Sequence, residues 1–250
     1  MIQLIRRGRA TAAPPLLAVP GMDGSIGSIA PLIEKLCTQR EVIVVDYTAE
    51  TNATLEGLAA EIANVAKTQI NGTMDLYGQS IGTILAAQLA SLHGLPVRKV
   101  ALTCTFTRLG WTVLRLGKFL MQLAPAWLFR ITLPRLMKYA CGPVGDGNQH
   151  PFFNAARHSD KTAMIKRTKW EINRDFSADL GKIQVPSLIL MGEKDRSVPN
   201  AAREIEKLRR LFADRPAQVI SIPNAGHVLL PSAAIAFAAD KIEEFLQRTD

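Results

Sequence analysis

Cysteine is scarce in this sequence and follows no pattern. Three cysteines, Cys37, Cys104 and Cys141, occur in 250 residues, at spacings that match neither a metal site nor a disulfide framework. An odd number of cysteines without a pattern is typical of free thiols in a reducing compartment. The sequence therefore argues against a fold held together by disulfides.

The sequence also lacks the marks of export and of membrane insertion. A very short, mostly apolar run at the N-terminus is followed by Arg6 and Arg7, which reverses the order of charges in a secretory signal. Apolar stretches free of charge are too short to cross a bilayer. We therefore expect a soluble, cytoplasmic protein.

Cofactor motifs are absent as well. The sequence has no Walker-type loop, no dinucleotide fingerprint and no cluster of metal ligands, so we expect neither a cofactor nor a metal. A net charge of +8 could serve a nucleic-acid partner if basic and aromatic residues shared one module. Much of the excess charge lies instead in one apolar segment, so we expect no nucleic-acid partner.

Short apolar runs alternate with amphipathic segments along most of the chain. This alternation predicts an α/β fold with a mostly parallel sheet flanked by helices on both faces. The expected strands are Ile2–Arg6, Leu16–Val19, Glu41–Asp46, a run that starts at Met74, Val97–Thr103, Val185–Met191 and Gln218–Ile222. The expected helices are Ile29–Cys37, Ala53–Lys67, Thr83–Ala90, Ala201–Phe212 and Ser232–Arg248.

The segment 106–180 breaks this alternation because it contains no convincing strand. Leu109–Ala140 is apolar and helical in character, with interruptions at Pro125 and Pro134, and Lys161–Asn173 is expected to form another helix. A mostly helical insertion between two strands predicts a lid over the carboxyl edge of the sheet. We therefore expect one α/β domain, residues 1–105 and 181–250, and a helical lid, residues 106–180.

One turn between an expected strand and an expected helix carries a reactive residue. The stretch Gly78–Gly82 reads Gly-Gln-Ser-Ile-Gly and matches G-x-S-x-G, in which a serine nucleophile sits on a strained turn. Glycines on both sides let strand and helix approach each other, and the helix N-terminus favours developing negative charge. A structural turn serine is the alternative, but the surrounding elements favour Ser80 as a nucleophile.

A serine nucleophile needs a base, and the base needs an acid that orients it. Asp195 and His227 each follow an expected strand, so both should lie at the carboxyl edge of the sheet. The order Ser80, Asp195, His227 is the order expected of a true nucleophile elbow. Glu193 competes with Asp195 for the role of the acid. The remaining histidines, which fall in a loop or in the insertion, are His93, His150 and His158.

In the joint order of these motifs, the chain resembles the α/β-hydrolase superfamily from Leu16 to the last helix. It resembles most the lid-bearing esterase, lipase and thioesterase-like members, whose acid strand and loop look like residues 185–199. The resemblance implies a catalytic triad of Ser80, His227 and Asp195, and it favours Asp195 over Glu193. Some relatives take the acid from the preceding strand, but residues 104–111 contain no carboxylate.

The negative charge that develops on a tetrahedral intermediate needs two backbone N–H donors. Ile81 should supply one of them, because it follows the nucleophile, and the loop after the early strand should supply the other. In the family this loop usually begins His-Gly-x. Here it reads Pro20-Gly21-Met22, so Met22 takes the place of the second donor. Asp23, next in the loop, is expected to form the turn.

The resemblance implies a serine hydrolase that cleaves small-molecule carboxylic esters of apolar acyl groups through an acyl-enzyme on Ser80. Acyl thioesterases and acyltransferases use the same triad, so both functions remain alternatives. Hydrolysis of a carbon–carbon bond is a third alternative. A non-catalytic ligand-binding protein on the same fold is the alternative of another class. Family members with an aspartate nucleophile are disfavoured because position 80 is serine.

The insertion has an unusual charge balance. Between Thr107 and Val144 there is no Asp or Glu, and large apolar residues are frequent. In one interpretation the apolar residues pack on the α/β domain and the cations are solvated. In the other, the apolar residues line an acyl pocket and the cations face an anionic lipid or an acyl carrier. The cations in this stretch are Arg108, Arg115, Lys118, Arg130, Arg135 and Lys138.

Overall fold

The computed structural model describes residues 2–50, 53–109, 111–146, 151–229 and 231–248. The strands in these ranges form one sheet in the order β1-β3-β2-β4-β5-β6-β7. Only β1, at the edge, runs antiparallel to its neighbour, which confirms the predicted mostly parallel sheet. The strands are β1 (Gln3–Arg7), β2 (Leu16–Val19), β3 (Val42–Asp46), β4 (Met74–Gln79), β5 (Val97–Thr103), β6 (Ser187–Gly192) and β7 (Ala217–Ile222).

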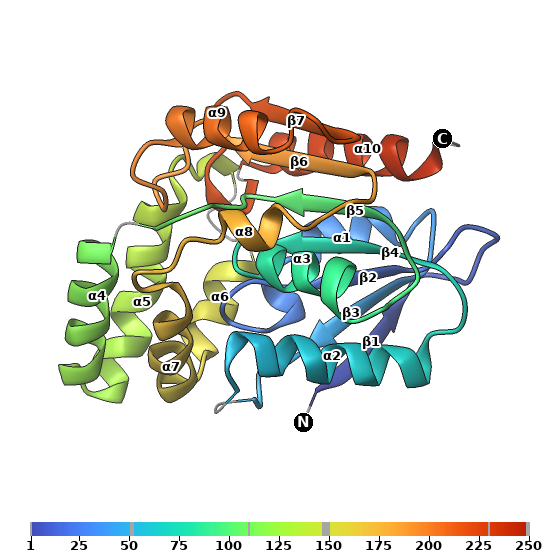
Figure 1. Ribbon diagram of the computed structural model, residues 1–250. Coiled ribbons are helices and arrows are strands. Elements are labelled where there is room, and N and C mark those ends of the chain that lie inside the picture. The colour runs from blue at the N-terminus through green and yellow to red at the C-terminus, as the bar shows by residue number, and fades with distance from the viewer. Residues whose placement is uncertain (1, 51–52, 110, 147–150, 230, 249–250) are drawn as a thin grey trace.

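Helices cover both faces of the sheet, and each face has its own apolar core (Figure 1). One face is covered by α1 (Ala30–Leu36) and α10 (Ser232–Gln247). The other is covered by α2 (Leu55–Gln69), α3 (Gly82–Leu92) and α9 (Ala201–Leu211). All four residues of β2 are buried, as expected for a parallel strand with helices on both sides.

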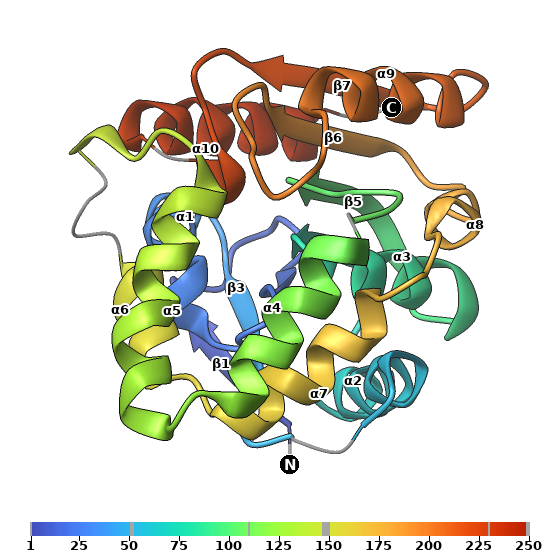
Figure 2. The same ribbon diagram turned by 90° about the vertical axis from the view of Figure 1, so that its left-hand side faces the viewer.

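Between β5 and β6 the described residues form only helices. Helices α4 to α7 lie beyond the end of the sheet to which β5 points (Figure 1), and Figure 2 shows them from that end. Pro125 caps the start of α5, whereas α5 continues through Pro134, where the sequence predicted an interruption. No helix in the described part of the chain is both long and apolar enough to cross a membrane. The helices of this insertion are α4 (Trp111–Leu123), α5 (Ala126–Cys141), α6 (Pro151–His158), α7 (Lys161–Glu171) and α8 (Ser177–Leu180).

A buried ion-pair network lies at the amino end of β4. Arg40 donates to Asp75 (3.0 Å) and to both carboxylate oxygens of Glu243 in α10 (2.8 and 2.9 Å). Arg98 in β5 donates to Asp75 as well, at 2.6 and 3.0 Å. The side chains of Arg40 and Asp75 are fully buried. The network therefore joins the centre of the sheet to the last helix, and of its charged side chains only that of Arg98 is partly exposed.

Candidate active site

Ser80 occupies the tight turn between β4 and α3. Its φ is 55°, in the left-handed region that side chains other than glycine rarely adopt. A Cβ on Gly78 would lie 2.6 Å from the Gly82 carbonyl oxygen, and a Cβ on Gly82 would collide with the carbonyl of Pro20. The two glycines are thus required because backbone passes directly against them. The turn holds the Ser80 side chain at the carboxyl edge of the sheet.

Ser80, His227 and Asp195 form one chain of hydrogen bonds. His227 Nε2 lies 2.9 Å from Ser80 Oγ, and His227 Nδ1 lies 2.7 Å from Asp195 Oδ2. With a proton on Nδ1 donated to the carboxylate, Nε2 accepts the hydroxyl proton of Ser80. Such an arrangement can activate a hydroxyl group for attack on a carbonyl carbon.

Asp195 is buried, and its environment favours the charged form. Burial raises the pKa of its carboxyl, but the charge of His227 and hydrogen bonds from His227 and Ser197 outweigh this effect and lower it below its ordinary value. Oδ1 of Asp195 accepts from the Ser197 amide (2.8 Å) and hydroxyl (2.6 Å). The Ser197 hydroxyl also lies 2.9 Å from His227 Nδ1. Sequence reasoning missed Ser197, although a serine two residues after an aspartate is a recognisable turn signal.

The competing residues lie elsewhere. The side chain of Glu193 is exposed and accepts a hydrogen bond from Ser221 Oγ at 2.9 Å. His93 follows the end of α3, and His158 ends α6 with its Nδ1 near a carbonyl of its own helix. His150 lies outside the described residues. Of the carboxylates considered from sequence, Asp195 is the one that the structure brings to His227.

The loop after β2 passes directly beside Ser80. A Cβ on Gly21 would lie 3.4 Å from Ser80 Cβ, and Met22 is the next residue of this loop. Ile81 follows Ser80 at the start of α3. No described residue accepts a hydrogen bond from the amide of either Met22 or Ile81. The two predicted donors therefore belong to the segments that adjoin Ser80, and neither amide is bonded to another described residue.

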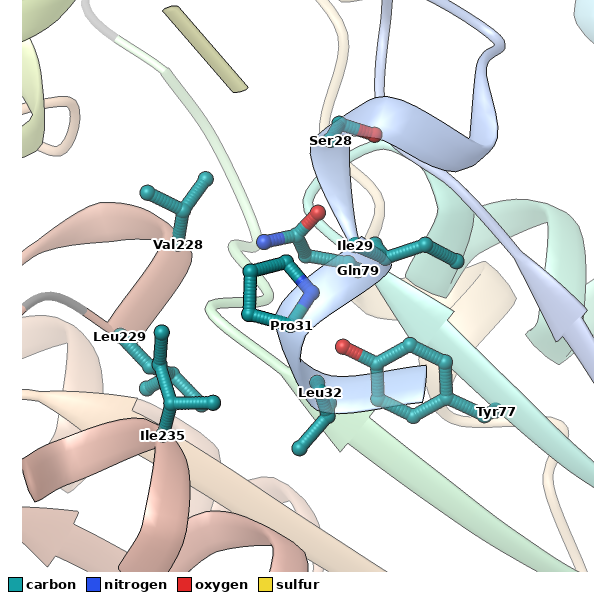
Figure 3. A pocket seen from close by; sticks show the side chains of 9 residues that line it. All are labelled: Ser28, Ile29, Pro31, Leu32, Tyr77, Gln79, Val228, Leu229 and Ile235. Carbon is teal, nitrogen blue, oxygen red and sulfur yellow. The ribbon is translucent and has the colours of Figure 1, made fainter. Parts of the chain in front are cut away.

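Among the described residues, a narrow cavity and a larger one lie near the site, and Ser80 is not among the residues that line them. A narrow one of about 10 Å³ has room for a single water and is closed mainly by apolar side chains (Figure 3). A larger one of about 340 Å³ lies between the loop after β2, the residues after β3, and helices α6 and α7. The small cavity is lined by Ser28, Ile29, Pro31, Leu32, Tyr77, Gln79, Val228, Leu229 and Ile235.

One group of potential metal ligands overlaps the candidate site. A sulfur, an oxygen and a nitrogen atom of Cys104, Asp195 and His227 lie within 4.8 Å of one another. Burial raises the pKa of the Cys104 thiol well above its ordinary value, so the thiolate that a metal needs is disfavoured. Both nitrogens of His227 are also engaged by protein atoms. The arrangement therefore fits proton transfer better than metal binding.

Two carboxyl groups near the site are buried deeply enough to change their acidity. Burial raises the pKa of Asp23 to about 6, against the effects of hydrogen bonds from Ser25 and Ser28 and of the Arg167 charge. Burial alone raises the pKa of Glu171, at the end of α7, to about 8. Glu171 is therefore mainly protonated, and neutral, in the folded protein at neutral pH.

We expect the substitution Glu171→Gln to change how stability depends on pH. In the unfolded chain this carboxyl ionises near its ordinary pKa of 4.5, whereas in the folded protein it stays protonated up to about pH 8. As the pH rises from 4.5 to 8, the unfolding free energy of the wild type should therefore decrease by an amount on the order of a few kcal/mol. The variant should not show this decrease, because glutamine does not ionise.

Urea unfolding of both proteins at about pH 5, 7 and 8.5 measures this difference. The exposed Glu34→Gln substitution is the matched control and should shift stability equally at all three values. A difference between wild type and Glu171→Gln that stays constant across the range would contradict a neutral, buried Glu171.

A model of the family described as "Alpha/beta hydrolase family" matches residues 13–240. The chain belongs to this family. Among curated proteins, the pimeloyl-[acyl-carrier protein] methyl ester esterase of Neisseria meningitidis serogroup A is 28% identical over 186 residues, which are 71% of this chain and 58% of that protein. The protein of the same description from serogroup B, serotype 15, is 29% identical over 196 residues, 75% of this chain and 71% of that one.

Solved structures share the fold over nearly the whole chain. An esterase from Exiguobacterium antarcticum superposes with a TM-score of 0.81 at 14% identity, and the match covers 99% of this chain and 96% of the other. The enol-lactonase from Burkholderia xenovorans gives a TM-score of 0.80 at 19% identity, with the same coverage of both chains. These likenesses confirm the α/β-hydrolase fold expected from the sequence.

Proposed function

We propose that this protein is a carboxylic ester hydrolase that acts through an acyl-enzyme on Ser80. The observation that carries the proposal is the continuous chain of hydrogen bonds from Ser80 through His227 to Asp195. Esterases among the relatives and the structural neighbours support the same reaction class. An intact hydrogen-bonded triad also disfavours a protein that only binds ligands on this fold.

In the proposed reaction, His227 Nε2 takes the hydroxyl proton as Ser80 Oγ attacks the ester carbonyl carbon. The Met22 and Ile81 amides stabilise the negative charge on the carbonyl oxygen. His227 then gives its proton to the departing alkoxide, which leaves as the alcohol and an acyl-Ser80. Water then attacks the carbonyl carbon of acyl-Ser80 while His227 takes a proton from it. His227 gives this proton to Ser80 Oγ as the carboxylic acid is released. Throughout, Asp195 holds the imidazole in the required tautomer and stabilises its positive charge.

We propose further that residues 106–180 form a lid and that the acyl group is apolar. Buried residues of three insertion helices, Phe129, Leu133, Ala156 and Met164, form an apolar cluster. Met22, whose amide is a proposed donor, packs against this cluster. The acyl group of an ester bound at Ser80 would therefore enter apolar surroundings, which favours medium or longer acyl chains over acetate.

Two measurements test the proposed function. A fluorophosphonate probe should label Ser80, and absence of labelling would favour the non-catalytic alternative. A chain-length series of nitrophenyl esters, measured beside acyl-thioesters and beside an added alcohol as acceptor, separates esterase from thioesterase and acyltransferase activity. Equal or faster turnover of thioesters, or transfer to the alcohol in place of hydrolysis, would replace the proposal by the corresponding alternative.

A second proposal concerns the partner that delivers the ester. The hairpin of α4 and α5 exposes cationic side chains together with large apolar ones. Its sequence contains no carboxylate. Such a surface complements an acidic one. Because the curated relatives are named for an ester carried by acyl-carrier protein, we propose an acidic acyl carrier as the partner. The exposed apolar side chains of the hairpin are Phe119, Leu120, Leu123, Trp127, Ile131, Leu136 and Tyr139.

We expect the double substitution Arg130→Gln and Arg135→Gln to weaken use of a carrier-bound ester alone. Both residues are exposed on α5. Loss of two cations should lower kcat/KM for the carrier-bound methyl ester about 3- to 10-fold and reduce its dependence on salt, because rim charges act mainly on association. The free methyl ester of the same acid should be hydrolysed at the wild-type rate.

The matched control replaces Arg203 and Arg209 with Gln, because both are exposed on α9, away from the hairpin. If the two double variants had equal effects, the loss of activity would reflect the net charge of the protein and not a contact of the hairpin with the carrier. Vesicles that contain anionic lipid form the second arm. Salt-sensitive binding to these vesicles, with no preference for the carrier-bound ester, would assign the hairpin to a lipid surface instead.

A further inference from the structure

The loop of residues 20–25, here named the oxyanion loop, is held from behind by a buried tyrosine. Tyr47 directly follows β3 and has no exposed surface. Its hydroxyl lies 2.9 Å from the Pro20 carbonyl oxygen and also donates to the carbonyl oxygen of Gly21. The Tyr47 amide in turn donates to the carbonyl oxygen of Gly24 at 3.0 Å. Tyr47 therefore contacts the loop at Pro20 and Gly21 through one shared hydroxyl proton and at Gly24 through its amide.

The bond to Gly21 matters most, because the Gly21 carbonyl and the Met22 amide belong to one peptide unit. A trans peptide is planar, and its C=O and N–H point in opposite directions. The Gly21 oxygen accepts from the Tyr47 hydroxyl and also from the Gly24 amide at 3.0 Å. Donors that hold this oxygen on one side direct the Met22 N–H to the other side. Since Gly21 lies against Ser80, the orientation of this peptide decides whether the Met22 N–H can reach the reacting oxygen.

An arginine from the insertion holds the next peptide units. Arg167, in α7, is 2% exposed, and its Nη1 donates to the carbonyl oxygens of Met22 (2.8 Å) and Asp23 (2.9 Å). Its Nη2 donates to the carbonyl oxygens of Tyr47 (2.6 Å) and Glu50 (2.8 Å). The guanidinium also lies over the Tyr47 ring, 4.9 Å from its centroid. Arg167 and Tyr47 thus form one buried unit that fixes the peptides on both sides of Met22.

We propose that Tyr47 and Arg167 are positioning residues that aim the Met22 N–H at the oxygen of the reacting carbonyl. This inference rests on the proposed ester hydrolysis. The loop begins with Pro20 where related loops usually begin with histidine, and the tyrosine and arginine supply the support from outside the loop. Through Arg167, helix α7 of the insertion belongs to the catalytic apparatus as well as to the proposed lid.

The decisive variant is Tyr47→Phe, which keeps the ring beside Arg167 and removes only the hydroxyl. Arg167→Lys is the second variant, because it retains the charge and loses the forked geometry. Each should lower kcat about 10- to 100-fold with little change in KM, somewhat less than loss of a complete oxyanion donor. The affinity for a trifluoromethyl ketone, which forms a tetrahedral adduct with Ser80, should fall by a similar factor.

Arg174→Gln is the matched control. Arg174 follows α7 and ties it to Glu56 in α2, but it is not bonded to the oxyanion loop. This variant should stay within about twofold of wild type in kcat and in ketone affinity. Equal losses of ketone affinity and of ground-state substrate binding in Tyr47→Phe would indicate a role in pocket shape and overturn the proposal.

Amide hydrogen exchange gives a readout that does not need activity. Peptides that cover residues 20–25 should exchange faster in Tyr47→Phe and Arg167→Lys than in wild type or Arg174→Gln. An inactive wild type would refute the proposed ester hydrolysis, and the exchange rates would still decide whether these residues hold the loop. Wild-type exchange in this loop, or wild-type kcat in an active Tyr47→Phe enzyme, would overturn the inference.

Discussion

Ester hydrolysis by the Ser80→Ala variant is expected to fall on the order of 10⁴-fold or more, because the attacking oxygen is removed. His227 and Asp195 would remain in place but would have no hydroxyl to activate. Binding and the two amide donors can still support slow attack by water, so a small residual rate is expected. Turnover of a nitrophenyl ester at saturating concentration measures the loss.

A folding defect can be separated from the loss of the nucleophile. Alanine and serine are similarly strained at the positive φ of position 80, whereas glycine adopts this conformation readily. The Ser80→Gly variant should therefore be as inactive as Ser80→Ala and at least as stable as wild type. Ser91→Ala, in helix α3 that follows Ser80, is the control and should keep full activity. Substantial turnover by Ser80→Ala would refute the assignment of the nucleophile.

Asp195→Asn is expected to lower kcat about 10⁴-fold, the second largest effect. The amide cannot hold the proton of His227 Nδ1 as a carboxylate does, so the imidazole can adopt the wrong tautomer. The lowered pKa of Asp195 follows from the same contacts, because His227 and Ser197 stabilise its charge. Loss of that charge also removes the stabilisation of the imidazolium that forms during attack.

Glu193→Gln provides the comparison, since Glu193 is two residues away and bonds Ser221 at the surface. This variant should retain turnover within a fewfold of wild type. Thermal unfolding of both variants shows whether a loss arises from the site or from the fold. If Glu193→Gln lost more activity than Asp195→Asn, the acid of the triad would have to be reassigned.

Local patterns made the elements around the site predictable. The turn at Ser80 is encoded within five residues, because its two glycines and its serine are needed at fixed positions along the chain. The strand before Asp195 is a mostly apolar, buried run, and the strand before His227 is rich in β-branched residues. Parallel strands place their carboxyl ends at one edge of the sheet. The order of the motifs then indicates which side chains meet, without knowledge of any contact.

The supporting contacts could not be predicted, because they join residues that are distant in the sequence. Arg167 and the Met22 carbonyl are separated by 145 positions, and nothing in either local sequence points to the other. Tyr47 presents a similar difficulty, since a tyrosine after a strand has many possible partners. Backbone carbonyls accept these bonds, and every residue has a carbonyl, so the amino-acid sequence does not indicate which one is the acceptor.

Asp75 shows the same limit at the other end of β4. A carboxylate inside a buried strand contradicts the apolar pattern when the strand is considered alone. Its charge is matched by Arg98 on the neighbouring strand and by Arg40, which lies far away in the sequence. Removal of one partner from such a buried pair typically costs about 3–5 kcal/mol.

The bonds between Arg40 and Glu243 make an early part of the chain depend on its last helix. These residues are 203 positions apart, so Arg40 is synthesised long before Glu243. Until Glu243 is present, the Nε and Nη2 groups of Arg40 lack the carboxylate to which they donate in the folded protein. Until α10 is in place, the apolar side of α1 also lacks one of the surfaces on which it packs. The central strands can associate before α10 is synthesised. Their final packing, with the charge of Arg40 paired to Glu243, requires α10. The α/β domain can therefore complete its folding only after α10 has been synthesised.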